Sequence, residues 1–418
     1  MASISGAFLL LCLSLPAQTG DEAPTIALRG GTVLTVSNGT IEGGTVVMSG
    51  GKITAVGKDV AIPEGATVVD VSGKFVMPGI VDTHSHMGVY SWPGGRANAD
   101  GNEATDPITP HVRAEDSVNV EDPAFERALA GGVTTIQIIP GSANLIGGQG
   151  VVVKLRLGET LDGMKFEGAP RGIKMAFGEN PKRVYGGRSK MPSTRMGNAY
   201  TMRKAFVEAQ DYGRKWKDYE ERKAEGEDEG PPPARDLKLE VLRDVLDGKI
   251  RVHIHCYRQD GILKLIEISK EFGFHIASFQ HCLEGYKVAE QIAANKSGVA
   301  TFADWWGYKV EAWDAVPHNA AILASKGVRV AIHSDSSDLI QRLYHEAAKA
   351  VKYGLSEEEG LKSITLHPAW MLGIDDRVGS IEVGKDADIA VLSKHPYDIY
   401  TRVEKTYLDG RLAYELQE

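Results

Sequence analysis

The sequence predicts an α/β protein, a (β/α)8 TIM-type barrel with a small β-sandwich built from both chain termini. Two observations lead to this prediction. Between residues 76 and 375, apolar runs of strand length alternate with segments of helical periodicity, which is typical of parallel α/β units. On either side, short strand-like runs carry too few apolar positions to form separate cores. We expect a signal segment at 1–20, sandwich strands in 21–75 and 376–418, and the barrel at 76–375.

The chain begins with 20 residues that contain no charged side chain and include the apolar run 7–15. Such a run is too short to span a bilayer and predicts a cleaved export signal, hence a periplasmic or extracellular protein. Only Cys256 and Cys282 remain after cleavage. Two cysteines are no disulfide framework, so we expect buried free thiols, with a bridge between neighbouring strands left open.

The charge of the chain limits the classes of partner that it is expected to bind. The 418 residues carry a net charge of −9 and contain no dense Lys/Arg cluster, which argues against nucleic acid or an anionic membrane surface. We therefore expect a small-molecule substrate. A homo-oligomer stays open, because the sequence does not define subunit contacts.

Short strands are expected at both ends of the chain. Turn pairs at Asn38-Gly39 and Gly50-Gly51 indicate hairpins in the first region. The predicted strands are 25–28, 31–36, 44–48, 52–56, 67–70, 381–392, 403–408 and 411–415. Neither group is complete alone, so we expect the two termini to pair.

Eight strands are expected in the barrel, the second of them a continuous β-branched run typical of a strand covered on both faces. They are 76–84, 133–139, 151–155, 173–177, 250–255, 275–281, 299–302 and 328–335, with helices such as 262–272, 286–295, 319–326 and 339–353 between them. Two segments do not fit this repeat. Residues 88–120 are long enough to cover the site, and the charged stretch 211–236 reads as a solvated helix and surface excursion.

The first barrel strand ends in His84-Ser-His86. Side chains at i and i+2 of a strand point to the same face, so the two imidazoles project together from its carboxyl end. Neutral imidazole is a common ligand for zinc and related metals. Alone, this spacing is more often structural than metal-binding.

Three further potential ligands stand at carboxyl ends of predicted strands: His255, His281 and Asp335. Each has a simpler explanation when taken singly, and Asp335 could cap the next helix. His253 and His275 are expected to be packed interior or surface residues. Five ligand-type residues at one end of a parallel barrel, where the sites of such barrels lie, predict a metal centre.

Together these motifs resemble the metal-dependent amidohydrolase superfamily over nearly the whole chain after the signal. Pro-Gly-x-x-Asp-x-His-x-His stands at 78–86, Gly-Gly-Val-Thr-Thr at 131–135 and Gly-Lys-Asp-Ala-Asp at 384–388. Stretches 140–149, 178–182 and 255–260 are similar to the imidazolonepropionase-related exported amidohydrolases. The resemblance implies a hydrolase of carbon–nitrogen bonds rather than ester bonds.

The resemblance also implies one or two divalent ions, with Zn²⁺ as the expected metal. Binuclear members bridge their metals with a fourth-strand residue, usually a carboxylated lysine and in some branches a glutamate. Lys174 and Glu179 both qualify, but their strand parities differ, so one face presents both only if the strand bends at Gly178. We favour Glu179, keep Lys174 as the alternative, and leave a mononuclear site open. The implied ligands are His84, His86, Glu179, His255, His281 and Asp335.

The implied chemistry is attack of a metal-bound hydroxide on an amide or peptide-like carbonyl. A divalent ion lowers the pKa of bound water from about 16 to about 7. Asp335 is the expected catalytic residue, taking the water's proton and passing it to the departing nitrogen. Gln149, Arg258 and Tyr90 are expected near the substrate, with ordinary loop contacts as the alternative.

The substrate expected from this chemistry is a dipeptide, an N-acyl amino acid or a cyclic amide. Two alternatives remain at this stage. One is opening of a cyclic amide or amidine, as in imidazolonepropionase. The other is a catalytically inactive scaffold with the same fold, against which the intact ligand set argues.

Overall fold

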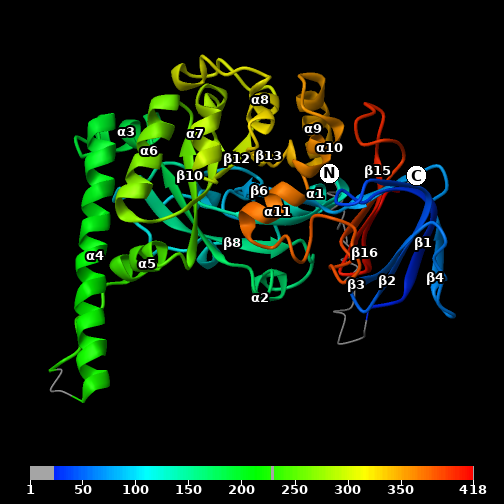
Figure 1. The fold of residues 1–418 in the computed structure, drawn as a ribbon, viewed down its shortest axis with the longest axis horizontal. Helices are drawn as coiled ribbons and strands as arrows, with labels where there is room; N and C mark the ends of the chain where they lie inside the picture. Colours follow the sequence, from blue (N-terminus) through cyan, green and yellow to red (C-terminus); the bar gives the residue numbers. More distant parts are fainter. Residues whose placement is uncertain (1–22, 227–229, 418) are drawn as a thin grey trace, which may run out of the picture.

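The computed structural model describes residues 23–226 and 230–417. Figure 1 shows two parts, a sheet formed by the chain ends and, beside it, the barrel with its helices. The expected signal segment lies outside the described residues. Over residues 23–226 and 230–417, no helix combines the length and apolarity needed to cross a membrane.

One eight-stranded sheet joins the two ends of the chain in the order β16-β15-β14-β5-β1-β2-β3, with β4 paired to β1. β5 makes the join, because it runs parallel to β1 and antiparallel to β14. The termini therefore pair as the sequence predicts, within one continuous sheet, and a two-layered sandwich stays a prediction. The strands are β1 (Ile26–Leu34), β2 (Thr40–Ser49), β3 (Lys52–Gly57), β4 (Thr67–Asp70), β5 (Phe75–Pro78), β14 (Ile389–Leu392), β15 (Val403–Leu408) and β16 (Arg411–Glu415).

The expected first barrel strand, 76–84, is in fact two strands. β5 belongs to the terminal sheet, and β6 (Ile80–Ser85) begins the barrel. Between them, Gly79 donates its N–H to the Asp388 carbonyl at 2.8 Å. A Cβ at Gly79 would lie 2.2 Å from Thr134 Oγ1, so only glycine fits where the chain passes from one sheet to the other. The boundary between the two parts is thus at Gly79, slightly later than expected.

The barrel sheet contains eight strands in chain order from β6 to β13. Its first and last strands are linked where Asp335 donates its N–H to the His84 carbonyl at 3.2 Å, which leaves the barrel nearly closed. The remaining strands are β7 (Val133–Ile138), β8 (Ile146–Lys154), β9 (Arg171–Ala176), β10 (Ile250–Cys256), β11 (Ile276–His281), β12 (Gly298–Thr301) and β13 (Val330–Ile332).

The third barrel strand, β8, departs from the predicted parallel arrangement. It begins at Ile146 rather than 151 and runs antiparallel to both β7 and β9. Only residues 139–145 connect it to β7. A parallel neighbour needs a crossover of about a dozen residues or more, so this short connection forces a hairpin.

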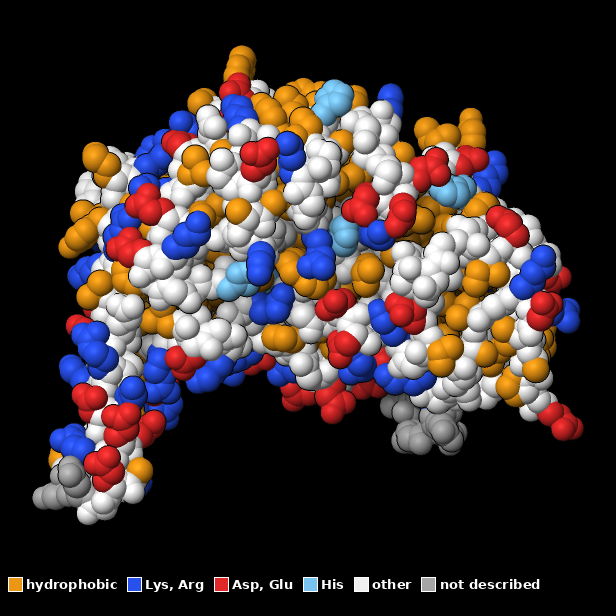
Figure 2. All heavy atoms as spheres, in the orientation of Figure 1, with side chains coloured by type: hydrophobic (Ala, Val, Ile, Leu, Met, Phe, Trp, Pro, Cys, Tyr) orange, Lys and Arg blue, Asp and Glu red, His pale blue; other side chains and the backbone are white. Residues whose placement is uncertain are grey.

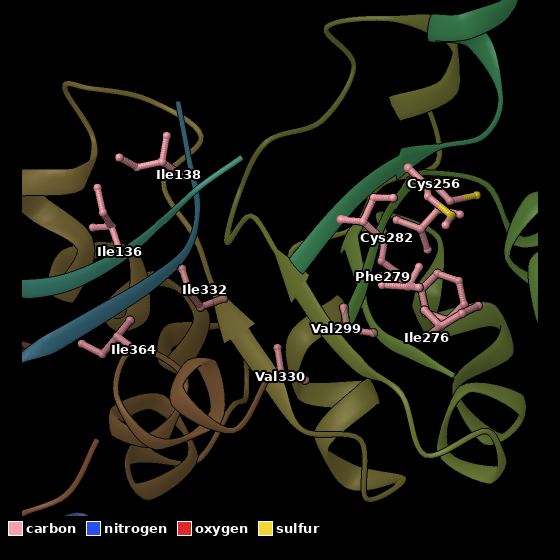
Figure 3. Close-up of a cluster of buried hydrophobic side chains, with 14 of the residues drawn as sticks. Ile136, Ile138, Cys256, Ile276, Phe279, Cys282, Val299, Val330, Ile332 and Ile364 are labelled. Atoms are coloured by element: carbon pink, nitrogen blue, oxygen red, sulfur yellow. The ribbon is translucent and has the colours of Figure 1, made fainter. Parts of the chain in front are cut away.

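Helices and buried side chains surround the strands. The helices are η1 (Arg96–Asn98), η2 (Ala114–Asp116), α1 (Ala124–Ala130), α2 (Leu161–Met164), α3 (Glu179–Gly186), α4 (Arg195–Glu225), α5 (Leu237–Leu246), α6 (Gln259–Phe272), η3 (Gly285–Val288), α7 (Ala289–Ala294), η4 (Val310–Ala312), α8 (Asn319–Ser325), η5 (Ile340–Arg342), α9 (Leu343–Lys352), α10 (Glu357–Lys362) and α11 (Leu366–Leu372). Apolar side chains of β7, β11, β12 and β13 fill the main core (Figure 3). Cys256 and Cys282 lie in it as buried free thiols, as expected.

The charged stretch that begins at residue 211 forms the outer half of α4, which projects from the body in Figure 1. Basic and acidic side chains are interspersed along this projection (Figure 2). Most residues of this stretch are exposed, which agrees with the solvated helix predicted there.

A buried lysine ties the barrel to the terminal sheet. Lys154, the last residue of β8, is 1% exposed and binds three carboxylates, those of Asp386 at 2.8 Å, Asp388 at 3.0 Å and Asp409 at 2.5 Å. Burial acts to lower the Lys154 pKa, but these carboxylates outweigh it and raise that pKa above its ordinary value. The Gly-Lys-Asp-Ala-Asp segment therefore supplies two of the three carboxylates through which Lys154 connects the barrel to the terminal sheet.

Candidate metal centre

Imidazole and carboxylate groups converge at the carboxyl ends of β6, β11 and β13. The potential ligand atoms of His84, His281 and His333 lie within 4.8 Å of one another, as do those of His84, His86 and Asp335. Period-2 alternation explains why His84 and His86 project together. His84 belongs to both groups and lies at the centre of the site.

Hydrogen bonds at the Nδ1 atoms fix the first two histidines. His84 Nδ1 lies 2.8 Å from Gln280 Oε1, and His86 Nδ1 lies 2.7 Å from the Ile139 carbonyl oxygen. Each Nδ1 therefore carries the proton, and each Nε2 presents its lone pair to the site. The Nε2 atoms lie 3.6 and 3.2 Å from Asp335 Oδ1.

Asp82, two residues before His84, supports the backbone of the site. Its carboxylate accepts hydrogen bonds from the His84 N–H at 3.0 Å and from Ser334 Oγ at 2.5 Å. It therefore links β6 to the segment after β13. Burial raises its pKa to about 7.

His333 is a member of the site that the sequence reasoning missed. It is buried, its Nε2 lies 3.2 Å from His281 Nδ1, and its ring stacks on His84 with centroids 5.0 Å apart. The signal was present in the sequence, because His333-Ser-Asp335 repeats the spacing of His84-Ser-His86. Two residues of one strand face again point to the same axis.

His281 and Asp335 hold left-handed backbone conformations, with φ of 68° and 48°. Non-glycine residues adopt this region at a cost, and such residues concentrate at functional sites. Here the bend lies where β11 ends and just beyond β13, and it turns both side chains toward His84.

His255 lies at the edge of the cluster. Its ring centroid is 4.8 Å from that of His281, and its Nε2 is 3.4 Å from Asn180 Nδ2. Its Nδ1 is buried without a hydrogen-bond partner among the described residues. His253 lies one layer deeper and binds Ser278 at 2.8 Å, which agrees with the packed role expected for it.

The two candidate bridging residues lie in different surroundings. Lys174 is fully buried, and its Nζ lies 3.2 Å from His84 Nε2 and 3.2 Å from the Pro140 carbonyl oxygen. Burial lowers its pKa to about 7, so much of its amine is neutral near neutral pH. Because its Nζ lies beside His84 Nε2, the Lys174 amine reaches the centre of the histidine cluster.

Glu179, the candidate favoured from the sequence, follows a bend at Gly178, where φ is 114°. It begins α3, and its N–H donates to Glu311 Oε2 at 3.0 Å. In the described part of the chain, the groups whose ligand atoms lie within 4.8 Å of one another include neither Glu179 nor His255. The bend carries this residue out of the strand, so the geometry favours Lys174.

Asp335 does not cap the helix that follows it. The N–H groups of Asp338 and Leu339 donate to Ser336 Oγ at 3.2 and 3.3 Å, so the serine performs that role. Burial acts to raise the pKa of the Asp335 carboxyl, but the neighbouring His84 and His86 rings lower it below its usual range. Its side chain is 24% exposed and that of His86 is 21% exposed, which leaves both accessible to a small molecule.

The donor set fits a divalent metal ion. Burial lowers the pKa of His84, His255 and His281 well below the ordinary value, and that of His333 to about 4. The imidazoles are therefore neutral and able to bind metal through their lone pairs. Several lone pairs and one carboxylate facing each other repel unless a cation lies between them.

The three residues expected near substrate have different locations. Tyr90 packs edge-on against His86 with ring centroids 5.7 Å apart and is in the site region. Arg258 pairs with Asp260 at 3.0 Å on the surface. Gln149 uses both ends of its amide elsewhere, with the Pro110 carbonyl and with Arg171. The substrate-binding roles of Arg258 and Gln149 stay predictions, and the contacts seen here are those of the alternative, ordinary loop contacts.

The segment 88–120 packs beside the cluster. Asn144, in the β7–β8 connection, donates to the Glu103 carbonyl at 2.7 Å, the Asp106 carbonyl at 2.9 Å and Thr109 Oγ1 at 2.9 Å. These bonds hold the segment against the rim of the site where Tyr90 meets His86.

An aromatic wall lines the other side of the cluster. The Tyr257 ring lies 4.5 Å from His255, centroid to centroid, and the Phe302 ring stacks on His281 at 5.2 Å. Trp305 stacks on Phe302 at 4.3 Å, and the Tyr308 hydroxyl donates to that of Tyr257 at 3.0 Å. The site is therefore bounded by flat apolar surfaces with a few polar groups.

Known proteins are similar to this chain in sequence and fold. The amidohydrolase tasK of Hapsidospora irregularis is 36% identical over 393 residues, which cover 89% of this chain and 40% of that protein. An imidazolonepropionase of Thermoplasma volcanium is 28% identical over 181 residues, 41% of this chain and 43% of that one. The chain thus spans about two fifths of the length of these curated relatives in the matched regions.

A crystal structure of an amidohydrolase from Thermotoga maritima MSB8 is 42% identical, with a TM-score of 0.87, covering 94% of this chain and all of that one. A prolidase complexed with N-methylphosphonate-L-proline has a TM-score of 0.56 at 18% identity, covers 94% of this chain and all of that one, and shows a likeness of fold alone. The family described as the amidohydrolase family matches residues 75–413. This chain belongs to the amidohydrolase family.

Proposed function

We propose that this protein is a metal-dependent hydrolase of amide or peptide-like carbon–nitrogen bonds in small molecules. The observation that carries the proposal is the convergence of neutral imidazoles, the ionised Asp335 and the buried Lys174 amine at one end of the barrel. An intact donor set of this kind argues against an inactive scaffold.

We place His84, His86, His255, His281 and Asp335 as ligands of one or two divalent ions, with Zn²⁺ the expected metal. Lys174 replaces Glu179 as the candidate bridging residue, because its Nζ lies 3.2 Å from His84 Nε2. Ions held there would polarise the scissile carbonyl and activate water for attack on it.

The residues of the chain supply the remaining steps. Asp335 lies beside both first-strand histidines and is accessible, so its carboxylate accepts the proton of the attacking water and passes it to the departing nitrogen. Gln280 and the Ile139 carbonyl hold the two rings in one tautomer while this happens. The aromatic wall orients the substrate and excludes bulk water. We also propose that the protein is exported, from its uncharged apolar start.

The test combines metal analysis with turnover. Protein purified without chelator should contain one or two divalent ions per chain by elemental analysis. The reloaded enzyme should then hydrolyse members of a mixed library of dipeptides and N-acyl amino acids, and cyclic amides in the same library test the ring-opening alternative. Metal content near zero after reloading with zinc or manganese would refute the proposal.

A further inference from the structure

Lys309 is a partly buried cation at the edge of the site that no step above uses. It lies in the segment between β12 and α8, which also carries the aromatic wall residues Trp305 and Tyr308. Its ammonium lies 4.2 Å from the centre of the Tyr257 ring and 5.7 Å from that of Tyr308. Its one hydrogen bond among the described residues goes to Asn180 Oδ1, at 3.3 Å.

Lys309 makes no ion pair with any described residue, unlike other basic side chains around the barrel. Of the nearby acidic groups, Glu311 is engaged elsewhere, whereas Glu179 attracts the Lys309 ammonium without forming an ion pair with it. Glu311 binds Arg195 and the Glu179 N–H, and both glutamates act on the Lys309 ammonium only at longer range. Partial burial lowers the pKa of the ammonium, and this partly desolvated charge has no ion-pair partner among the described residues.

The ammonium faces the proposed metal ligands through one side chain. Asn180 accepts from Lys309 with its oxygen, and its Nδ2 lies 3.4 Å from His255 Nε2. The Tyr257 ring beneath the ammonium is 5.4 Å from the His281 ring, centroid to centroid. A substrate whose carbonyl lies at the histidine cluster therefore extends toward Lys309 within the length of a small molecule.

We propose that Lys309 binds a free carboxylate of the substrate, so that the preferred substrates are dipeptides and N-acyl amino acids with an unblocked carboxyl terminus. An ammonium in an apolar, aromatic setting gains most from a charged acceptor, and the paired hydroxyls of Tyr257 and Tyr308 offer an adjacent donor. This makes Lys309 a specificity-determining residue. The inference rests on the hydrolase function proposed above and narrows its substrate class.

The test compares L-alanyl-L-leucine with L-alanyl-L-leucinamide, which share the scissile bond but differ in charge. Metal-loaded parent protein should prefer the carboxylate by about 10- to 100-fold in kcat/KM, mainly through KM, as expected for one charge-assisted hydrogen bond. Lys309→Met should remove most of this preference, chiefly by raising KM for L-alanyl-L-leucine. Lys309→Arg should restore part of it. Lys58→Met, which removes an exposed charge in the terminal region, should match the parent.

Calorimetric binding of the same two compounds to parent and Lys309→Met separates this inference from the proposed function. Hydrolysis of both compounds at equal rates, unaffected by Lys309→Met, leaves the hydrolase standing and overturns the role of Lys309. Absence of hydrolysis with tighter, Lys309-dependent binding of the carboxylate supports the role of Lys309 and counts against the hydrolase. Absence of both hydrolysis and any carboxylate-dependent binding overturns both.

Discussion

Replacing Asp335 by asparagine isolates the proposed proton carrier from the rest of the site. The asparagine keeps the size of the side chain and removes its negative charge and its basic atom. The backbone conformation should persist, because φ is 48° at this position and asparagine tolerates the left-handed region better than most residues. The N–H bond to the His84 carbonyl, 3.2 Å in the parent, is also unaffected. We therefore expect a change of less than about 1 kcal/mol in the free energy of unfolding.

The rate should change far more than the stability. A positioned general base contributes about 10²–10⁴ to the rate, which corresponds to about 2.7–5.4 kcal/mol of barrier. Metal should be largely retained, because His84, His86, His255 and His281 remain. Steady-state kcat, elemental analysis and melting temperature on the same preparation measure the three effects separately.

Two comparison variants make the result decisive. His281→Asn should lower metal occupancy together with rate, because ligation is its proposed role. Ser336→Ala should lose about 1 kcal/mol of stability and keep a normal kcat, because Ser336 Oγ caps the helical turn after Asp335. If Asp335→Asn turned over near the parent rate with full metal content, the assignment of the base would be refuted.

Three further outcomes are expected. Lys174→Gln should lose part of the bound metal while Glu179→Gln retains it, as measured by elemental analysis, because only the lysine reaches His84; equal loss in both variants would contradict this. Lys154→Met should cost about 3–5 kcal/mol in urea unfolding, since it leaves the buried Asp388 carboxylate without a cation, whereas Asp386 keeps Arg377 and Asp409 keeps Arg156. The Lys154 pKa is raised in the folded parent protein. The stability that Lys154 adds is therefore present below the unfolded pKa of about 10.4 and is lost as pH rises through the higher folded value. A difference in unfolding free energy between parent and variant that did not change with pH would count against the cluster. Deleting residues 384–418 removes β14, β15 and β16 and should abolish soluble expression, and a truncated protein that is soluble and melts cooperatively would show that the terminal sheet does not need them.

Much of the site could be predicted because its information is local. The apolar run before His84 and the period-2 spacing to His86 fix which face both imidazoles share, whatever surrounds the strand. The same holds for His281 and Asp335 at or just beyond the ends of β11 and β13. The same spacing rule could have predicted His333, since it stands two residues before Asp335.

Other features depend on chain geometry beyond one strand. The antiparallel course of β8 follows from its seven-residue connection to β7, which was hidden while the strand was expected to begin at 151. Gln149 lies on this strand, and its amide oxygen accepts a hydrogen bond from Arg171 of the neighbouring β9. Its sequence neighbours carry no sign of that partner.

The sequence by itself determined the barrel, the pairing of the chain ends and the ligand-type residues at strand ends, because periodicity, turn residues and apolar runs act over a few neighbouring positions. Only the tertiary structure favours Lys174 over Glu179. That choice depends on the bend at Gly178 and on Lys174 lying opposite His84, a residue 90 positions away in the chain. Which long side chain fills the centre of a barrel is set by strands that meet only after the sheet has curled almost closed.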